Sequence, residues 1–166
     1  MKTIISLIIA WLFAGNIATA QITKAELQVA GLTCSMCSRS VDKSLRTLDF
    51  IDSVGIDLSK ASFVLFFKKD KTVDLGQIKK KVEDAGFFVA SLKIEYKFAD
   101  FKLENNSSLT YQKITFYFLN VTPKTLNGAV TFKIMDKGFV SDKVYKKYAS
   151  SLNGTTSSGT IYHVML

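Results

Sequence analysis

The chain has 166 residues, of which 48% are hydrophobic, 22% are charged and one is proline, a composition that excludes a disordered or low-complexity protein. This length is enough for one medium domain or two small ones. The formal net charge at pH 7 is +8, but the lysines are scattered and form no block, which is typical of a solvated surface rather than of a patch that steers a partner.

The N-terminal segment has the pattern of a cleavable export signal. Lys2 precedes an apolar run over residues 4–14, and Ala18-Thr19-Ala20 follows as a small-residue cleavage pattern. Gly15 and Asn16 end the apolar run well short of the roughly 20 residues that span a membrane. We therefore expect residues 1–20 to be a signal peptide and the protein to be exported without a stable membrane anchor. In a Gram-negative bacterium its compartment would be the periplasm.

Hydrophobic periodicity in residues 22–95 alternates between that of strands and that of helices. A strand ending at Gly31, a helix from Cys37, a hairpin, a second helix capped by Asp74 and a fourth strand follow one another. The apolar positions expected to face the core are Ala25, Leu27, Val29, Val41, Leu45, Leu48, Val54, Ile56, Leu58, Phe63, Leu65, Phe67, Leu75, Ile78, Val82, Ala85, Phe88, Ala90, Leu92 and Ile94. This βαββαβ order predicts an α+β fold, with a ferredoxin-like domain over residues 22–95 that folds alone.

Residues 96–166 have a β-rich pattern and one helix. The expected strands cover residues 96–104, 109–121, 128–136 and 160–166, with turns at Asn105-Asn106-Ser107 and Asn127-Gly128. Ser141 is a candidate cap for a short helix that contains Val144 and Tyr148 and ends at Asn153-Gly154. We expect a small, mostly-β domain to follow the first.

The two cysteines, Cys34 and Cys37, lie in the segment Gly31-Leu32-Thr33-Cys34-Ser35-Met36-Cys37, between the first strand and the first helix. A structural disulfide framework would need more cysteines at wider spacing. Two thiolates without a nearby histidine or carboxylate favour soft ions that accept two ligands, whereas Zn(II) prefers four. A helix N-terminus also stabilises a thiolate. The pattern predicts a site for Cu(I), or alternatively Hg(II), at Cys34 and Cys37.

The same segment resembles the loop of the heavy-metal-associated (HMA) domain family, which includes copper chaperones, copper-ATPase N-terminal domains and the periplasmic mercury-binding protein. The likeness continues through residues 56–61 and ends at residues 83–87, so it covers about residues 24–95. It implies a ferredoxin-like fold, metal ligation by Cys34 and Cys37, and a protein partner that donates or accepts the metal, such as a copper transporter.

Two positions depart from the family's pattern. Leu32 stands where methionine is usual, which is a volume-conserving change that should leave metal binding intact. Phe87 stands where cytosolic chaperones tend to have lysine, so it cannot offset the charge of a bis-thiolate copper site. In this respect the chain is similar to the ATPase domains.

Other function classes find less support in the sequence. With one histidine in the chain, no nucleophile, histidine and acid form a catalytic set, so we expect no enzyme. The alternative from another class is a thiol–disulfide oxidoreductase that uses Cys34 and Cys37. RNA-recognition motifs share the βαββαβ order, but residues 60–66 lack the glycine and aromatic at the front of their signature, which argues against a nucleic-acid partner.

Four further side chains have both a structural and a functional reading. We expect Met36 to face solvent rather than to be a thioether ligand, and His163 to be a surface residue rather than a second copper ligand. We expect Phe87 and Phe88 to close the core rather than to form a docking patch.

Overall fold

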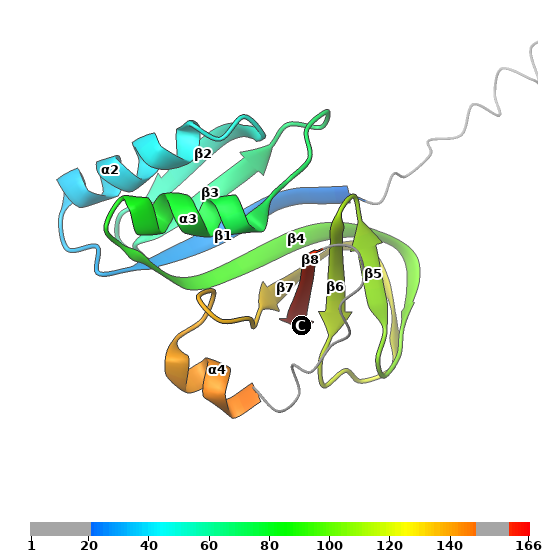
Figure 1. The fold of residues 1–166 in the computed structure, drawn as a ribbon. Coiled ribbons are helices and arrows are strands. Elements are labelled where there is room, and N and C mark those ends of the chain that lie inside the picture. Colours follow the sequence, from blue (N-terminus) through cyan, green and yellow to red (C-terminus); the bar gives the residue numbers. More distant parts are fainter. Residues whose placement is uncertain (1–20, 149–159) are drawn as a thin grey trace, which may run out of the picture.

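The computed structural model describes residues 21–148 and 160–166, which form three helices and one sheet of eight strands (Figure 1). The predicted signal peptide and the predicted helix end at Asn153-Gly154 lie outside the described residues. No helix in the described part of the chain has both the length and the apolar character needed to cross a bilayer.

The first half of the chain has the predicted βαββαβ order. Its elements are β1 (Gln21–Ala30), α2 (Ser35–Arg46), β2 (Ile51–Asp57), β3 (Ser62–Phe67), α3 (Leu75–Asp84) and β4 (Phe88–Leu103). The strands lie in the order β2-β3-β1-β4, all pairings are antiparallel, and α2 and α3 cover one face (Figure 1). This is the ferredoxin-like arrangement, and the prediction of an α+β fold is confirmed.

The two helices form where the hydrophobic periodicity predicts them, because each buries its apolar stripe against the sheet. Val41 and Leu45 of α2, and Ile78 and Val82 of α3, are fully buried. The cap of α3 is also as predicted, since the Asp74 Oδ1 atom accepts a hydrogen bond from the backbone N–H of Gln77 at 3.1 Å. The sequence pattern therefore predicts correctly which helix residues enter the core.

The β2–β3 hairpin departs from the predicted core. Ile56 and Leu58 were expected to continue the inward face of Val54, but they are 40% and 61% exposed. Only Ile51 and Val54 of β2 are buried, although Phe63, which pairs with Ile56, is fully buried. The difference arises because β2 is the edge strand and has no neighbouring strand on its outer side. The first strand ends as predicted, and at its other end β1 begins at Gln21, which pairs with Lys97.

Strand β4 joins the two halves of the molecule. The expected strands over residues 88–94 and 96–104 are one strand, so the predicted boundary after residue 95 lies within β4 (Figure 1). Along its length β4 pairs with β1 on one side and with β7 (Lys124–Ile134) on the other. Buried residues of both halves belong to one hydrophobic core.

The second half continues the same sheet in the order β4-β7-β8-β6-β5. Its other elements are β5 (Ser108–Tyr111), β6 (Ile114–Phe118), α4 (Asp142–Tyr148) and β8 (Thr160–Met165), and β6 and β8 are parallel. Aromatic rings fill the inner face: the centroids of Phe116 and Phe132 are 5.0 Å apart, and those of Phe118 and Phe132 are 5.6 Å apart. On the opposite face, α4 packs over Leu119, Met135 and Val140.

Two turn assignments in this half are corrected. The expected strand over residues 109–121 is divided into β5 and β6 by a turn at Gln112, whose φ is +54°. Asn127-Gly128 is wrong as a turn, because both residues lie within β7 and Gly128 pairs with Phe98. The register shifts between Phe98 and Phe101, so the glycine pattern marks a bulge instead of a chain reversal.

Candidate metal centre

The cysteine segment connects the end of β1 to the start of α2. Gly31 turns the chain with a φ of +86°, which favours glycine, and Leu32 is half-buried against the core. Cys34 is the N-cap of α2, and its Sγ atom accepts a hydrogen bond from the backbone N–H of Cys37 at 3.1 Å. Local sequence therefore places both cysteines at a helix N-terminus.

The two cysteines share one accessible position. Their Cα atoms are 5.3 Å apart and their sulfur atoms are joined in a disulfide, with Cys34 exposed and Cys37 half-buried. Two electrons and two protons convert this disulfide into two thiols, and loss of the thiol protons gives two adjacent thiolates. The site thus has a form that can ligate a soft metal and a form that cannot.

The electrostatics of the helix end favour an anion. Backbone N–H groups in the first turn of α2 have no partner within the helix, and the first turn contains no acidic residue. The N–H of Cys37 already points at the sulfur of Cys34. A pair of thiolates, or a bis-thiolate complex of a monovalent ion, is stabilised here by the helix dipole.

The donors that the structure brings together at this position are the two cysteine sulfurs. Among the described residues, no group of three or more His, Cys, Asp or Glu side chains is arranged to hold a metal ion. His163 lies on β8, which β4 and β7 separate from β1 in the sheet. The structure therefore does not bring the histidine to the cysteine pair.

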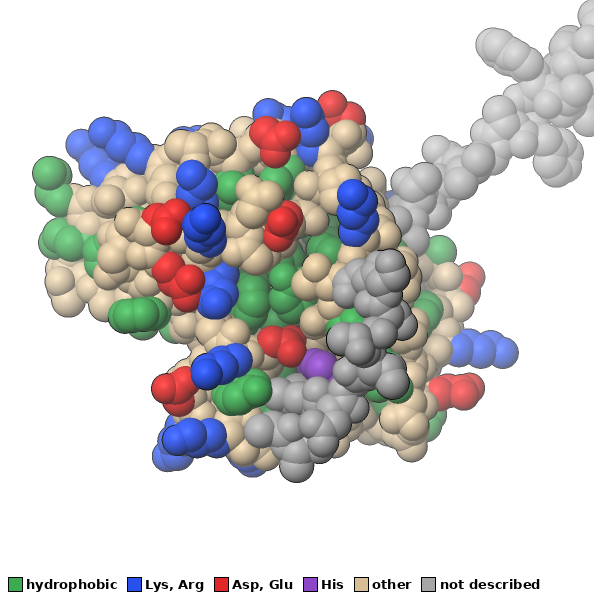
Figure 2. All heavy atoms as spheres, viewed as in Figure 1, with side chains coloured by type: hydrophobic (Ala, Val, Ile, Leu, Met, Phe, Trp, Pro, Cys, Tyr) green, Lys and Arg blue, Asp and Glu red, His purple; other side chains and the backbone are tan. Residues whose placement is uncertain are grey.

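An apolar rim, formed by Met36, Leu58 and Phe88, lies at the same end of the sheet as the cysteines. These side chains are 73%, 61% and 70% exposed. The Val29 N–H donates to the Ala61 carbonyl at 3.1 Å, which holds the β2–β3 turn beside the end of β1, and Phe88 pairs with Ala30. Figure 2 shows hydrophobic side chains gathered at this end of the molecule, where α2 begins.

Phe87 packs toward the core, whereas Phe88 is exposed. Phe87 is half-buried and its ring lies against Gly31, at the base of the cysteine loop. The expectation that Phe88 closes the core is wrong, because the register between β1 and β4 shifts at Gln28 and Val29, so that Val89 is buried and Phe88 faces solvent. Met36 faces solvent, as predicted.

His163 is the site residue that sequence reasoning misplaced. It was expected at the surface, but it is only 6% exposed, and its Nδ1 atom lies 2.9 Å from Oδ1 of Asp136. Alternation within the last strand indicated which face the histidine occupies. It could not indicate that this face is covered.

Comparison with known proteins supports the reading of the first half. Residues 26–88 match the family model described as the heavy-metal-associated domain. The chain is 40% identical over 67 residues to the Arabidopsis thaliana protein named "Probable copper-transporting ATPase HMA5", a match that covers 40% of this chain and 6% of the ATPase. It is 34% identical over 64 residues to the copper chaperone CopZ of Bacillus subtilis, covering 39% of this chain and 91% of CopZ.

A solved structure of a CopZ metallochaperone aligns with a TM-score of 0.38 and 26% identity, over 41% of this chain and 100% of that one. The chain spans less than a tenth of the length of the copper ATPases it matches, from 6% to 9%. Nearly the whole of a small copper chaperone, by contrast, is covered by the match. Through residues 26–88, the chain belongs to the heavy-metal-associated domain family.

Proposed function

We propose that this protein is exported, captures Cu(I) between Cys34 and Cys37, and hands it to a partner protein. The observation that carries the proposal is the exposed pair of sulfurs at the N-terminus of α2. The relationship to copper chaperones and copper ATPases supports copper as the metal. Residues 1–20, with their signal-peptide pattern, support export.

The ligand chemistry favours Cu(I) over Zn(II). Cu(I) is stable with two soft thiolates, whereas Zn(II) seeks four ligands and would have to take two from water or a second chain. A bis-thiolate Cu(I) complex carries one negative charge, and the helix N-terminus offsets it without the lysine that Phe87 replaces.

Hand-over requires the partner to reach the metal. Cys34 is exposed, so thiolates of a metal donor or acceptor can enter the coordination sphere before those of this chain leave. The apolar rim of Met36, Leu58 and Phe88 offers such a partner a surface around the sulfurs. A copper transporter with a domain of the same family is the partner we favour.

Two other functions use the same sulfurs. Hg(II) also accepts two thiolates, so the protein would then be a mercury scavenger. The disulfide between Cys34 and Cys37 is the observation that favours a thiol–disulfide oxidoreductase, although the ferredoxin-like topology is not that of thioredoxins.

Competition for Cu(I) separates these functions. Reduced protein is titrated against a calibrated Cu(I) chelator, alongside Cys34→Ser, Cys37→Ser and the control Ser35→Ala, with Hg(II) and Zn(II) run in parallel. We expect one tightly bound Cu(I) at the pair, loss of most of this affinity in each cysteine variant, no loss in Ser35→Ala, and weak Zn(II) binding.

Unchanged Cu(I) affinity in both cysteine variants would refute the proposal. Tight Hg(II) binding with weak Cu(I) binding would favour the scavenger. Catalytic turnover of disulfide substrates by the reduced protein, rather than slow stoichiometric exchange, would favour the oxidoreductase.

A further inference from the structure

The hydrogen bonds of His163 determine its tautomer. The backbone N–H of His163 donates to Oδ2 of Asp136 at 2.7 Å, and the ring Nδ1 lies 2.9 Å from Oδ1 of the same carboxylate. An ionised carboxylate only accepts hydrogen bonds, so Nδ1 carries the proton. In the neutral imidazole, Nε2 is then left with a bare lone pair. A carboxylate behind one ring nitrogen is the usual arrangement of a histidine that binds metal through the other.

The other ring nitrogen of His163 is buried and unpaired among the described residues. In the part of the chain that the structure describes, Nε2 of His163 is inaccessible to solvent and has no hydrogen-bond partner. A buried polar atom without a hydrogen-bond partner lowers the stability of the folded protein, and a ligand that binds this atom would remove that cost.

The thioether side chains of Met135 and Met165 lie on the same face of the sheet as His163. Met135 and His163 are cross-strand neighbours, since the Met135 N–H donates to the His163 carbonyl at 2.8 Å. Met165 is two residues beyond His163 on β8, so both side chains leave the strand on the same side, and Met165 pairs with Lys133 of β7. Side chains opposite or diagonal to each other on adjacent strands are within reach of one another when they are long.

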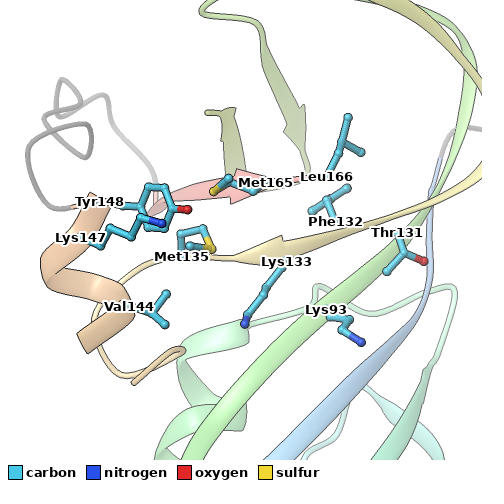
Figure 3. Close-up of a pocket in the computed structure, with 10 residues that line it drawn as sticks. All are labelled: Lys93, Thr131, Phe132, Lys133, Met135, Val144, Lys147, Tyr148, Met165 and Leu166. Atoms are coloured by element: carbon cyan, nitrogen blue, oxygen red, sulfur yellow. The ribbon is translucent and has the colours of Figure 1, made fainter. Parts of the chain in front are cut away.

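The two methionines also line one pocket. It has a volume of about 480 Å³ and lies between β7, β8 and α4, with Tyr148 among its other lining residues (Figure 3). Met135 is 4% exposed at its floor, and Met165 is half-buried. The pocket gives a small ion a route to the sulfur atoms without unfolding of the sheet.

We infer that Met135, Met165 and His163 form a second site for a soft monovalent cation, Cu(I), in the second half of the molecule. Thioether sulfur and neutral imidazole are ligands that Cu(I) accepts, whereas hard cations prefer oxygen. The ligands would be the Sδ atoms of the two methionines and Nε2 of His163, with Asp136 orienting the ring. No cysteine takes part.

Charge in the surroundings favours an ion of low charge. Lys93, Lys133 and Lys147 also line the pocket, and their ammonium groups oppose the entry of any cation, most strongly of a divalent one. Lys93 is paired with Glu26 at 3.5 Å. With the carboxylate of Asp136 behind the imidazole, a bound monovalent ion forms a neutral unit, whereas Cu(II) or Zn(II) would leave a net positive charge beside the lysines.

The test uses the mature chain, residues 21–166, with both cysteines changed to serine, so that the proposed function and this inference fail independently. Cu(I) is titrated into this protein under reducing conditions against a weak calibrated chelator. We expect one Cu(I) per chain. In the same background, Met135→Leu and Met165→Leu should each weaken binding about tenfold or more. Met36→Leu removes an exposed methionine of the first half and is the matched control, which should bind as the parent does.

A second measurement reports the ligands directly. Ag(I), which has the same charge and soft character as Cu(I) but no redox chemistry here, is added to protein labelled with ¹³C at the methionine methyl groups and with ¹⁵N in the histidine ring. The Met135 and Met165 methyl signals and the His163 ring signals should shift together, while the Met36 signal stays. Leucine preserves the volume of methionine, so the variants should remain folded, and thermal unfolding checks this.

The inference is overturned if the cysteine-free protein binds no Cu(I). It is equally overturned if folded Met135→Leu and Met165→Leu proteins bind as tightly as their parent, or if Met36→Leu alone removes the binding.

Discussion

The Oε1 atom of Gln112 accepts a hydrogen bond from the backbone N–H of Val73 at 3.1 Å. The Gln112 side-chain amide also donates to the Lys71 carbonyl at 3.2 Å. Gln112 belongs to the turn between β5 and β6, and Val73 precedes α3, so one side chain connects the second half of the molecule to the segment that leads into a helix of the first.

Removal of this side chain should destabilise the whole protein. Gln112→Ala leaves the N–H of the buried Val73 without its acceptor, and we expect the free energy of unfolding in urea to fall by about 1 kcal/mol. Lys113→Ala changes the exposed neighbour in the same turn and should alter it by less than about 0.5 kcal/mol. Equal effects of the two changes would show that the bond contributes nothing.

The first half should fold when it is expressed alone, but with reduced stability. A fragment of residues 22–95 keeps both helices, yet it ends inside β4, so Ile22 loses its partner Tyr96 and Val73 loses Gln112. We expect cooperative unfolding at a lower urea concentration than for residues 21–166, with retention of Cu(I) binding. A fragment of residues 21–103, which contains all of β4, is the comparison. A shorter fragment that lacks a near-ultraviolet circular dichroism signal would contradict this expectation.

Tyr162 should make stability depend on pH in the alkaline range. Burial, followed by the nearby carboxylates of Asp74 and Asp136, raises the pKa of Tyr162 to about 12. In the unfolded chain the value is near 10, so the folded protein holds this proton more tightly. The contribution to stability is complete below about pH 10 and is lost as the pH rises through about 12.

Tyr162→Phe should remove this part of the alkaline loss of stability, measured by urea unfolding at a series of pH values. It should also remove the latest step of tyrosinate formation followed by ultraviolet absorbance. Tyr145→Phe, on α4, should leave that step in place. Persistence of the late step in Tyr162→Phe would assign it to another tyrosine.

Export should be accompanied by cleavage after Ala20, because Ala18 and Ala20 follow the apolar run. The mature protein would then begin at Gln21, the first residue of β1. Intact mass of protein recovered from an exporting host measures the N-terminus. A soluble exported form that retains Met1 would show that this interpretation is wrong.

The local patterns of the first half were sufficient to predict its order of elements. The stripes of Val41 and Leu45 and of Ile78 and Val82 have helical spacing, and Asp74 is a cap that acts on residues three positions away. The cysteine pair could also be found without a structure, because a helix N-terminus, two soft ligands and their spacing are all properties of adjacent residues.

Contacts between distant segments decided the features that the local patterns did not predict. A register shift between β1 and β4 turned Phe88 to solvent, and no periodicity in residues 88–94 records it, because a bulge depends on the partner strand. The continuity of β4 across residue 95 depended on β7, which pairs with it from the far side. Likewise, the alternation around His163 specified a face of the last strand. It did not indicate that the imidazole would be buried beside Asp136, because the two residues are 27 positions apart and meet only in the folded sheet.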